Sequence, residues 1–216
     1  MIIINLKNYK FGDELTLLGK KIKRYLGQDG IVCVSSSDFY KFVNLKLNIY
    51  AQHVDWHPSG KSTGFVVPES LASYKVKGSL LNHAEHQISF EEIKKTVLRC
   101  NEHGLKLIIC SSNLKEIKEL IKLKPYGIAF EDPYLISTGK SIVNFKQEDL
   151  IEFVKILKNK GIKIICGAGV SSAKDYIQAK KIGCDGVLIS SAIVNSKNPD
   201  KLLKELEEAI NEKKEK

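Results

Sequence analysis

A short apolar run recurs eight times along this chain, and that repetition limits the folds it can adopt more than any other feature. The runs are built mostly from Ile, Val and Leu and lack the polar alternation of a strand with one wet face. Such runs are typical of strands buried on both faces of a parallel sheet. Strands are therefore expected at residues 2–6, 31–35, 47–52, 78–82, 105–110, 126–131, 162–166 and 186–190.

Segments with helical spacing separate the runs. In residues 89–104, Ser89 and Glu92 have the spacing of a helix-capping pair, and Gly104 can end the helix. Similar helices are expected at 113–124, 146–161, 171–183 and 198–212, with weaker signals at 13–26, 36–44 and 68–75. Eight strand–helix units predict an α/β fold, a closed (β/α)8 barrel. The alternative is an open doubly wound sheet, which at this length usually shows a topological break or a second domain.

The chain contains no linker or low-complexity segment, so residues 1–216 are expected to form one domain, with only the last few residues disordered. No window approaches the ~18 consecutive apolar residues of a membrane span, and the polar N-terminus does not resemble a signal peptide. The five cysteines form no C-x-x-C pair. Buried free thiols in a reducing cytoplasm are therefore expected.

A net charge of +9 at pH 7 admits three kinds of partner: nucleic acid, an anionic membrane or an anionic metabolite. Much of the excess lies in helix-like lysine patches such as residues 20–24. The chain has neither the aromatic pattern of an RNA-recognition motif nor zinc-finger spacing. We therefore expect a solvated basic surface, with neither nucleic acid nor a membrane as partner.

In a barrel of this kind, catalytic groups lie where the strands end. The first, fourth and sixth runs lead to Lys7, His83 and Glu131, which should meet at one rim. A carboxylate and an imidazole around a small pocket can move protons, and a nearby lysine favours an anionic substrate. Taken singly, Lys7 fits a surface lysine, His83 a structural histidine or, with His86, half of a metal pair, and Glu131 an ion-pair partner. No third ligand is suitably spaced, so neither a metal nor a cofactor is expected.

The seventh and eighth runs end in small residues, Gly167-Ala168-Gly169 and Ser190-Ser191. Their backbone N–H groups can approach an oxyanion closely. Ser171 and Ser172 should then begin a helix, and a helix N-terminus attracts phosphate. The layout predicts proton transfer on a small phosphorylated substrate.

Six segments carry a resemblance to a known family, in family order from residue 5 to residue 192. They are NLKNY (5–9), AQHVD (51–55) with TG (63–64), LLNHAEH (80–86), FEDPYLISTGK (130–140), CGAGVSS (166–172) and DGVLISSA (185–192). The chain resembles the triosephosphate isomerases, and specifically their short archaeal branch. The resemblance implies a TIM barrel and the interconversion of D-glyceraldehyde 3-phosphate and dihydroxyacetone phosphate, in glycolysis and gluconeogenesis.

The resemblance also implies catalytic roles. Glu131 would carry the proton between C1 and C2, and His83 would act as a neutral imidazole on the substrate oxygens. Lys7 would hold the substrate and balance its charge, with Asn5 as a hydrogen-bonding neighbour and Glu85 as its ion-pair partner.

Binding and assembly follow from the same likeness. Ile136 would lie where a lid over residues 132–140 meets the phosphate, and Gly169, Ser190 and Ser191 would supply backbone groups that bind the phosphate. Thr63 would contact a neighbouring subunit in a homodimer or homotetramer.

Several positions depart from the family pattern. Ala84 stands where a serine is usual, and Asp132 and Ser137 stand where archaeal relatives usually have proline and glycine. Ser190-Ser191 replaces the Gly-Gly of bacterial and eukaryotic relatives and the Ala-Ser of archaeal ones. The competing hypotheses are another phosphate-binding barrel enzyme, which would lack the N-x-K and N-H-x-E segments, and a non-catalytic binding protein, which would have lost the Lys, His or Glu.

Overall fold

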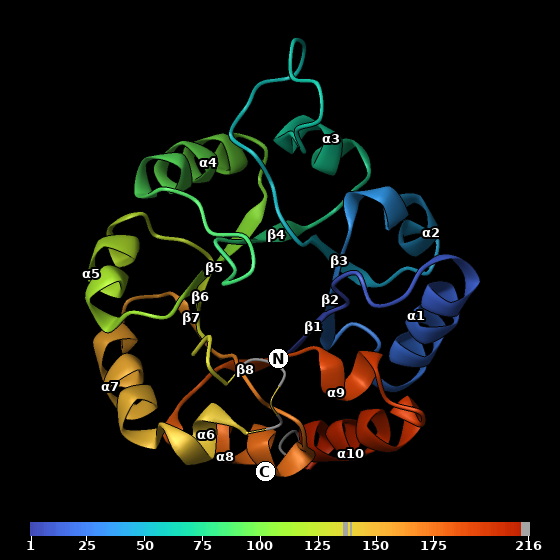
Figure 1. The fold of residues 1–216 in the computed structure, drawn as a ribbon, viewed down its shortest axis with the longest axis vertical. Helices are drawn as coiled ribbons and strands as arrows, with labels where there is room; N and C mark the ends of the chain where they lie inside the picture. The colour runs from blue at the N-terminus through green and yellow to red at the C-terminus, as the bar shows by residue number, and fades with distance from the viewer. Residues whose placement is uncertain (136–137, 139, 213–216) are drawn as a thin grey trace.

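Eight parallel strands form a closed barrel in the computed structural model, which describes residues 1–135, 138 and 140–212 (Figure 1). Each strand pairs with the next along the chain, and β1 also pairs with β8, which closes the ring. The strands are β1 Ile2–Asn5, β2 Gly30–Val34, β3 Asn48–Ala51, β4 Gly78–Leu81, β5 Lys106–Ser111, β6 Gly127–Phe130, β7 Lys163–Cys166 and β8 Gly186–Ile189. The predicted (β/α)8 barrel and all eight of its strands are confirmed.

Helices surround the barrel (Figure 1). They are α1 Gly12–Leu26, α2 Phe39–Val43 after a 3-10 turn at Ser36–Asp38, α3 Pro68–Ser73, α4 Phe90–Glu102, α5 Leu114–Lys122, α6 Ile142–Phe145, α7 Gln147–Leu157, α8 Ala173–Ile182, α9 Ser191–Val194 and α10 Pro199–Asn211. Every predicted helix is present, and Ser89 and Glu92 form the expected capping box. The four-residue helices α6 and α9 were not predicted, because so short a segment shows no helical periodicity.

The strands separate two apolar clusters. Alternate strand residues such as Ile3, Ala129 and Leu188 fill the barrel interior, and their neighbours pack outward against the helices. Both strand faces are therefore buried, which explains why the runs lack polar alternation. All five cysteines are buried and free, as expected. Among the helices of the described residues, none is both long and apolar enough to cross a bilayer.

The barrel interior leaves no room for a side chain at Gly78, the first residue of β4. A Cβ atom there would lie 1.9 Å from the carbonyl oxygen of Lys106 and 2.6 Å from the ring of Tyr50. Tyr50 is itself buried among the interior residues. The glycine therefore allows β4 to pair with β5 beside a large ring.

Two sequence-based expectations are not tested here. Residues 213–216, which include the segment expected to be disordered, lie outside the described residues. The assignment of residues 1–216 to a single domain stays a prediction.

We expect Gly78→Ala to lower the free energy of unfolding by about 2 kcal/mol or more, since the added carbon overpacks a rigid strand pair. Thermal unfolding followed by circular dichroism measures the effect. Lys77→Ala, at the exposed neighbouring position, is the control and should change stability by less than about 0.5 kcal/mol. Equal stability of the two variants would contradict the packing account.

Candidate active site

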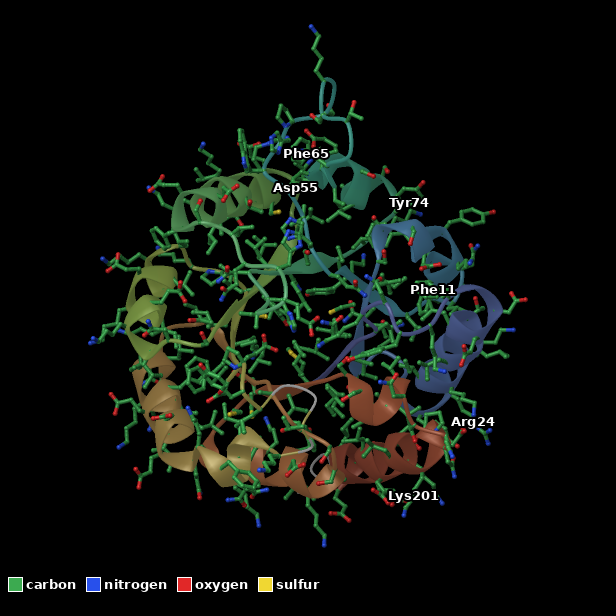
Figure 2. The ribbon with its side chains drawn as sticks, in the orientation of Figure 1. Phe11, Arg24, Asp55, Phe65, Tyr74 and Lys201 are labelled. Carbon is green, nitrogen blue, oxygen red and sulfur yellow. The ribbon has the colours of Figure 1, made fainter. Side chains whose placement is uncertain are left out.

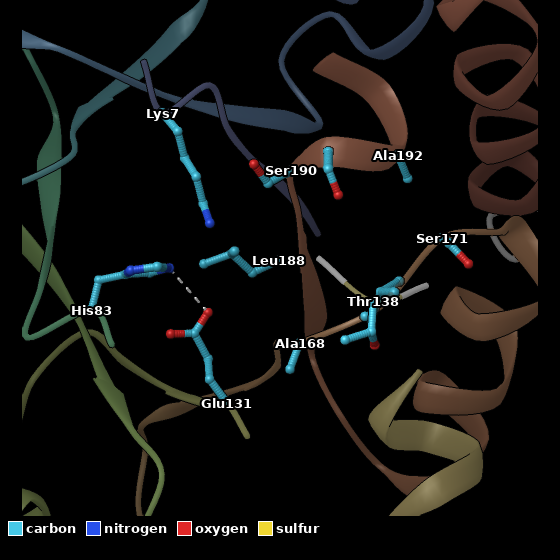
Figure 3. Close-up of a pocket in the computed structure, with 12 residues that line it drawn as sticks. Lys7, His83, Glu131, Thr138, Ala168, Ser171, Leu188, Ser190 and Ala192 are labelled. Carbon is cyan, nitrogen blue, oxygen red and sulfur yellow. Dashed lines mark ion pairs between the residues drawn. The ribbon is translucent and has the colours of Figure 1, made fainter. Parts of the chain in front are cut away.

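A cavity of about 280 Å³ opens at the carboxyl ends of the strands (Figure 3). Lys7, His83 and Glu131 line it, and they come from the ends of β1, β4 and β6. Inward-facing positions alternate along a strand, so Glu131, two residues beyond the interior residue Ala129, projects into the ring. The three residues predicted to meet at one rim do lie together.

Lys7 reaches the cavity through an unusual backbone conformation. Its φ of 47° is left-handed, which costs an L-residue of order 1–2 kcal/mol. Two hydrogen bonds hold it: the Lys7 N–H donates to Asn5 Oδ1 (3.1 Å), and Gln52 Nε2 donates to the Lys7 carbonyl oxygen (3.0 Å). Its ammonium lies 2.5 Å from Glu85 Oε1, so the expected Lys7–Glu85 pair is present.

The turn after β4 aims His83 at the cavity. Asn82 adopts a left-handed conformation (φ 59°), so the residue after it departs from the strand alternation. The Asn82 side chain fixes this turn, because its Nδ2 donates to the carbonyl oxygen of Cys110 (3.1 Å) and its Oδ1 accepts the N–H of Ile88 (3.1 Å).

One hydrogen bond sets the tautomer of His83. The backbone N–H of Glu85 donates to His83 Nδ1 at 3.1 Å, so Nδ1 acts as an acceptor. In a neutral imidazole the proton then lies on Nε2. That nitrogen faces the cavity and is 3.6 Å from Glu131 Oε1, as the dashed line in Figure 3 marks.

Glu131 is a buried carboxylate with one uncommitted oxygen. Its side chain is 3% exposed, and its Oε2 has no hydrogen-bond partner among the described residues. The Glu131 N–H donates to the carbonyl oxygen of Ser111 (3.0 Å), which continues the β5–β6 ladder to the base of the side chain. The glycine at position 167 leaves room for the Glu131 side chain, because a Cβ atom on residue 167 would lie 2.6 Å from Glu131 Cγ.

The cysteine beside the carboxylate remains a thiol. Burial, and after it the negative charge of Glu131, raises the pKa of Cys110 well above its ordinary value. Cys110 therefore adds no charge to the site at neutral pH.

Small residues form the other side of the cavity (Figure 3). Gly169 has a φ of 68°, and a Cβ atom there would lie 1.9 Å from the carbonyl oxygen of Lys140. Ser190 Oγ is buried without a hydrogen-bond partner among the described residues. Helix α9 begins at Ser191, and the first N–H groups of a helix have no intrahelical acceptor. These unused donors suit an anion with several acceptor oxygens.

The expectation that the N-terminus at Ser171 and Ser172 attracts phosphate is wrong. Both N–H groups already donate to Asp175 Oδ2, at 3.0 and 3.1 Å. Asp175 belongs to a capping box with Ser172, the N-cap of α8. The cap consumes these donors, although Ser171 still lines the cavity.

Glu131 and Thr138 are the described residues of the FEDPYLISTGK segment that line the cavity. Ile136, expected to meet the phosphate, lies outside the described residues. Ser137 and Gly139 lie outside them as well. The role of Ile136 therefore stays a prediction.

A second cavity of about 500 Å³ adjoins the first through Lys7 and His83. Asn5 and Glu85 line this larger cavity. Thr63 lines neither cavity of its own chain and is exposed on the loop before α3.

Sequence reasoning missed Leu188 and Ala192, which also line the catalytic cavity. Leu188 could have been found from the strand alternation, because it lies two residues before Ser190. Ala192 belongs to α9, which left no periodic signal. Across the described residues, no group of three or more His, Cys, Asp or Glu side chains is arranged to hold a metal ion.

Comparison with known proteins gives one consistent result. The family model for triosephosphate isomerase matches residues 1–206. The triosephosphate isomerase of Saccharolobus solfataricus is 35% identical over 95% of this chain and 93% of its own length. That of Sulfurisphaera tokodaii is 34% identical with the same coverage, and that of Methanocaldococcus jannaschii is 32% identical over 95% of this chain and 98% of its own.

The matched range contains all eight strands of the barrel together with Lys7, His83 and Glu131. The chain belongs to the triosephosphate isomerase family.

Proposed function

We propose that Glu131, His83 and Lys7 carry out the reaction of this isomerase, the interconversion of D-glyceraldehyde 3-phosphate and dihydroxyacetone phosphate. The observation that carries the assignment is the convergence of an acid, an imidazole and an amine on one small cavity with anion donors on its far side. Phosphate held near Ser190, Ser191 and Gly169 would place the three-carbon chain between these groups.

In the proposed reaction, the Glu131 carboxylate takes a proton from the carbon next to the carbonyl. The electrons of that C–H bond form a C=C bond, and the carbonyl oxygen becomes an enediolate oxygen. His83 Nε2–H donates to this oxygen and can pass a proton between the two oxygens. Glu131 returns its proton to the neighbouring carbon, which completes the isomerisation.

Lys7 supplies the positive charge. Its side chain is 9% exposed, so little water screens it from the developing negative charge. The positive charge of the Lys7 ammonium would stabilise the negative charges of both the phosphate and the enediolate.

We also propose a homodimer or homotetramer. The loop that carries Thr63 and Phe65 projects from the barrel, as Figure 2 shows with Phe65 and Asp55 labelled on it. Within the loop, Trp56, His57 and Phe65 stack at ring-centroid distances of 4.2 and 3.6 Å, which gives the projection a defined shape. The larger cavity beside Lys7 is a concave surface that such a loop from a second copy can fill.

A cytoplasmic location is the remaining proposal. Five buried free cysteines support it, because thiols persist in a reducing compartment.

Glu131→Asp should lower kcat by about 100-fold or more with little change in KM, because the shortened carboxylate is displaced from the carbon it deprotonates. A coupled assay with glyceraldehyde 3-phosphate measures both constants. Glu148→Asp on α7 serves as the matched control. Turnover within a few-fold of the parent protein would remove Glu131 from the role of base.

Ser190→Ala should weaken inhibition by inorganic phosphate roughly tenfold, which is the value of one lost hydrogen bond to a charged group. The inhibition constant against glyceraldehyde 3-phosphate reports the change. Ser196→Ala, outside the catalytic cavity, should leave it unaltered. An unchanged constant in Ser190→Ala would show that this hydroxyl does not contact phosphate.

Light scattering at micromolar concentration should give twice the 24.2 kDa chain mass or a higher multiple. Thr63→Arg, at an exposed loop position, should shift the mass toward the monomer, since a bulky charge obstructs insertion. Asn211→Arg, exposed at the end of α10, controls for added charge. A monomeric mass for the unaltered protein would refute the oligomer.

A further inference from the structure

A second carboxylate follows the proposed base directly, and it is also buried. The side chain of Asp132 is 6% exposed. Its Oδ1 accepts the N–H of Tyr134 at 2.8 Å, and its carbonyl oxygen accepts the N–H of Leu135 at 3.0 Å. Asp132 therefore fixes the first turn of chain after Glu131.

The remaining oxygen of Asp132 binds a lysine from a different element. Lys146 Nζ lies 2.5 Å from Asp132 Oδ2, although the two residues are separated by the whole segment between β6 and α7. Hydrogen bonding to Asp132 raises the pKa of Lys146, so the lysine is charged at neutral pH. The pair is a salt bridge with one buried end.

Lys146 is itself held by the backbone of two helices. It lies at the junction of α6 and α7, where its N–H donates to the carbonyl oxygen of Ile142 (3.0 Å) and its carbonyl oxygen accepts the N–H of Leu150 (3.1 Å). The lysine therefore projects from a fixed point.

Helix α6 connects this point to the part of the cavity wall at the end of β7, beside Glu131. The Ile142 N–H donates to the carbonyl oxygen of Ala168 at 3.2 Å, and Ala168 lines the cavity. Asn144 Nδ2 also donates to Asp175 Oδ1 in α8 at 3.3 Å. A continuous series of polar contacts thus joins the residue after Glu131 to the adjoining cavity wall at Ala168.

We propose that the Asp132–Lys146 salt bridge positions Glu131 for proton transfer by tying the end of β6 to α6 and thereby to the cavity wall at Ala168. Asp132 and Lys146 are positioning residues, since neither lines the cavity. The inference rests on the proposed role of Glu131 as the base. Without the lysine, the buried Asp132 carboxylate lacks its counter-charge and the turn rearranges to reach water.

Two single variants test the pair. Lys146→Met removes the positive charge of the pair. Asp132→Asn removes the negative charge and keeps an Oδ1 acceptor for the N–H of Tyr134. Each should lower kcat by about 10-fold to 100-fold and change KM by less than about threefold, since a displaced base affects the transition state more than binding. Lys146→Arg should restore kcat to within about threefold of the parent, because arginine can also bind the carboxylate.

Two further readouts separate positioning from a general loss of stability. The double variant should be no slower than the slower single variant, because both changes remove one interaction. Inorganic phosphate released per turnover should rise in each single variant. A slower return of the proton from Glu131 prolongs the enediolate phosphate, which can then expel phosphate and form methylglyoxal.

Lys163→Met is the matched control. Its side chain is 45% exposed, as is that of Lys146, and it pairs with Asp185 at 3.3 Å at the start of β7, away from the catalytic end of the barrel. It should keep kcat within about twofold, as expected of an exposed ion pair. All variants are compared at a temperature where circular dichroism shows them folded.

Parent-like kcat in both single variants, additive losses in the double variant, or an equal loss in Lys163→Met would each overturn the proposal. These outcomes differ from a failure of the base assignment. If Glu131→Asp keeps its activity, the assignment of Glu131 as the base is wrong. If Glu131→Asp is inactive but Lys146→Met is fully active, only the positioning role of the salt bridge is wrong.

Discussion

Closure of the barrel is the constraint on which the rest of the molecule depends. The parallel pairing of β1 with β8 converts a series of strands into a ring, so strand ends that are far apart in sequence meet around one opening. Lys7 and Glu131 can share a cavity only because of this closure. Every strand is buried on both faces as a result. The apolar runs that predict the fold therefore also stabilise the ring, because their side chains are removed from water.

Much of this could be predicted from the sequence because the relevant signals are local and repeated. Eight apolar runs fix the number of strands, and strand alternation places Glu131 on the inner face. The Ser89–Glu92 spacing anticipates the capping box of α4. In a barrel the strand ends meet around one opening, so the sequence could predict that Lys7, His83 and Glu131 share a cavity.

What sequence reasoning missed depends on contacts between distant segments. The N-terminus of α8 looks available for phosphate until Asp175 is seen to occupy the N–H groups of Ser171 and Ser172. The orientation of the His83 side chain depends on the left-handed backbone conformation of Asn82. A hydrogen bond from the Asn82 side chain to the carbonyl oxygen of Cys110, on another strand, stabilises that turn. Helix α9 is too short to leave a periodic pattern, although its first residue, Ser191, lines the cavity.

Lys7 lines both cavities, so anything that fills the larger cavity also changes the surroundings of the ammonium in the smaller one. Whatever fills the larger space expels water from around the Lys7–Glu85 pair and lowers the local dielectric, so the ammonium acts more strongly on the neighbouring reaction space. In the homo-oligomer we propose, activity per chain would therefore depend on protein concentration, and dilution alone would lower it.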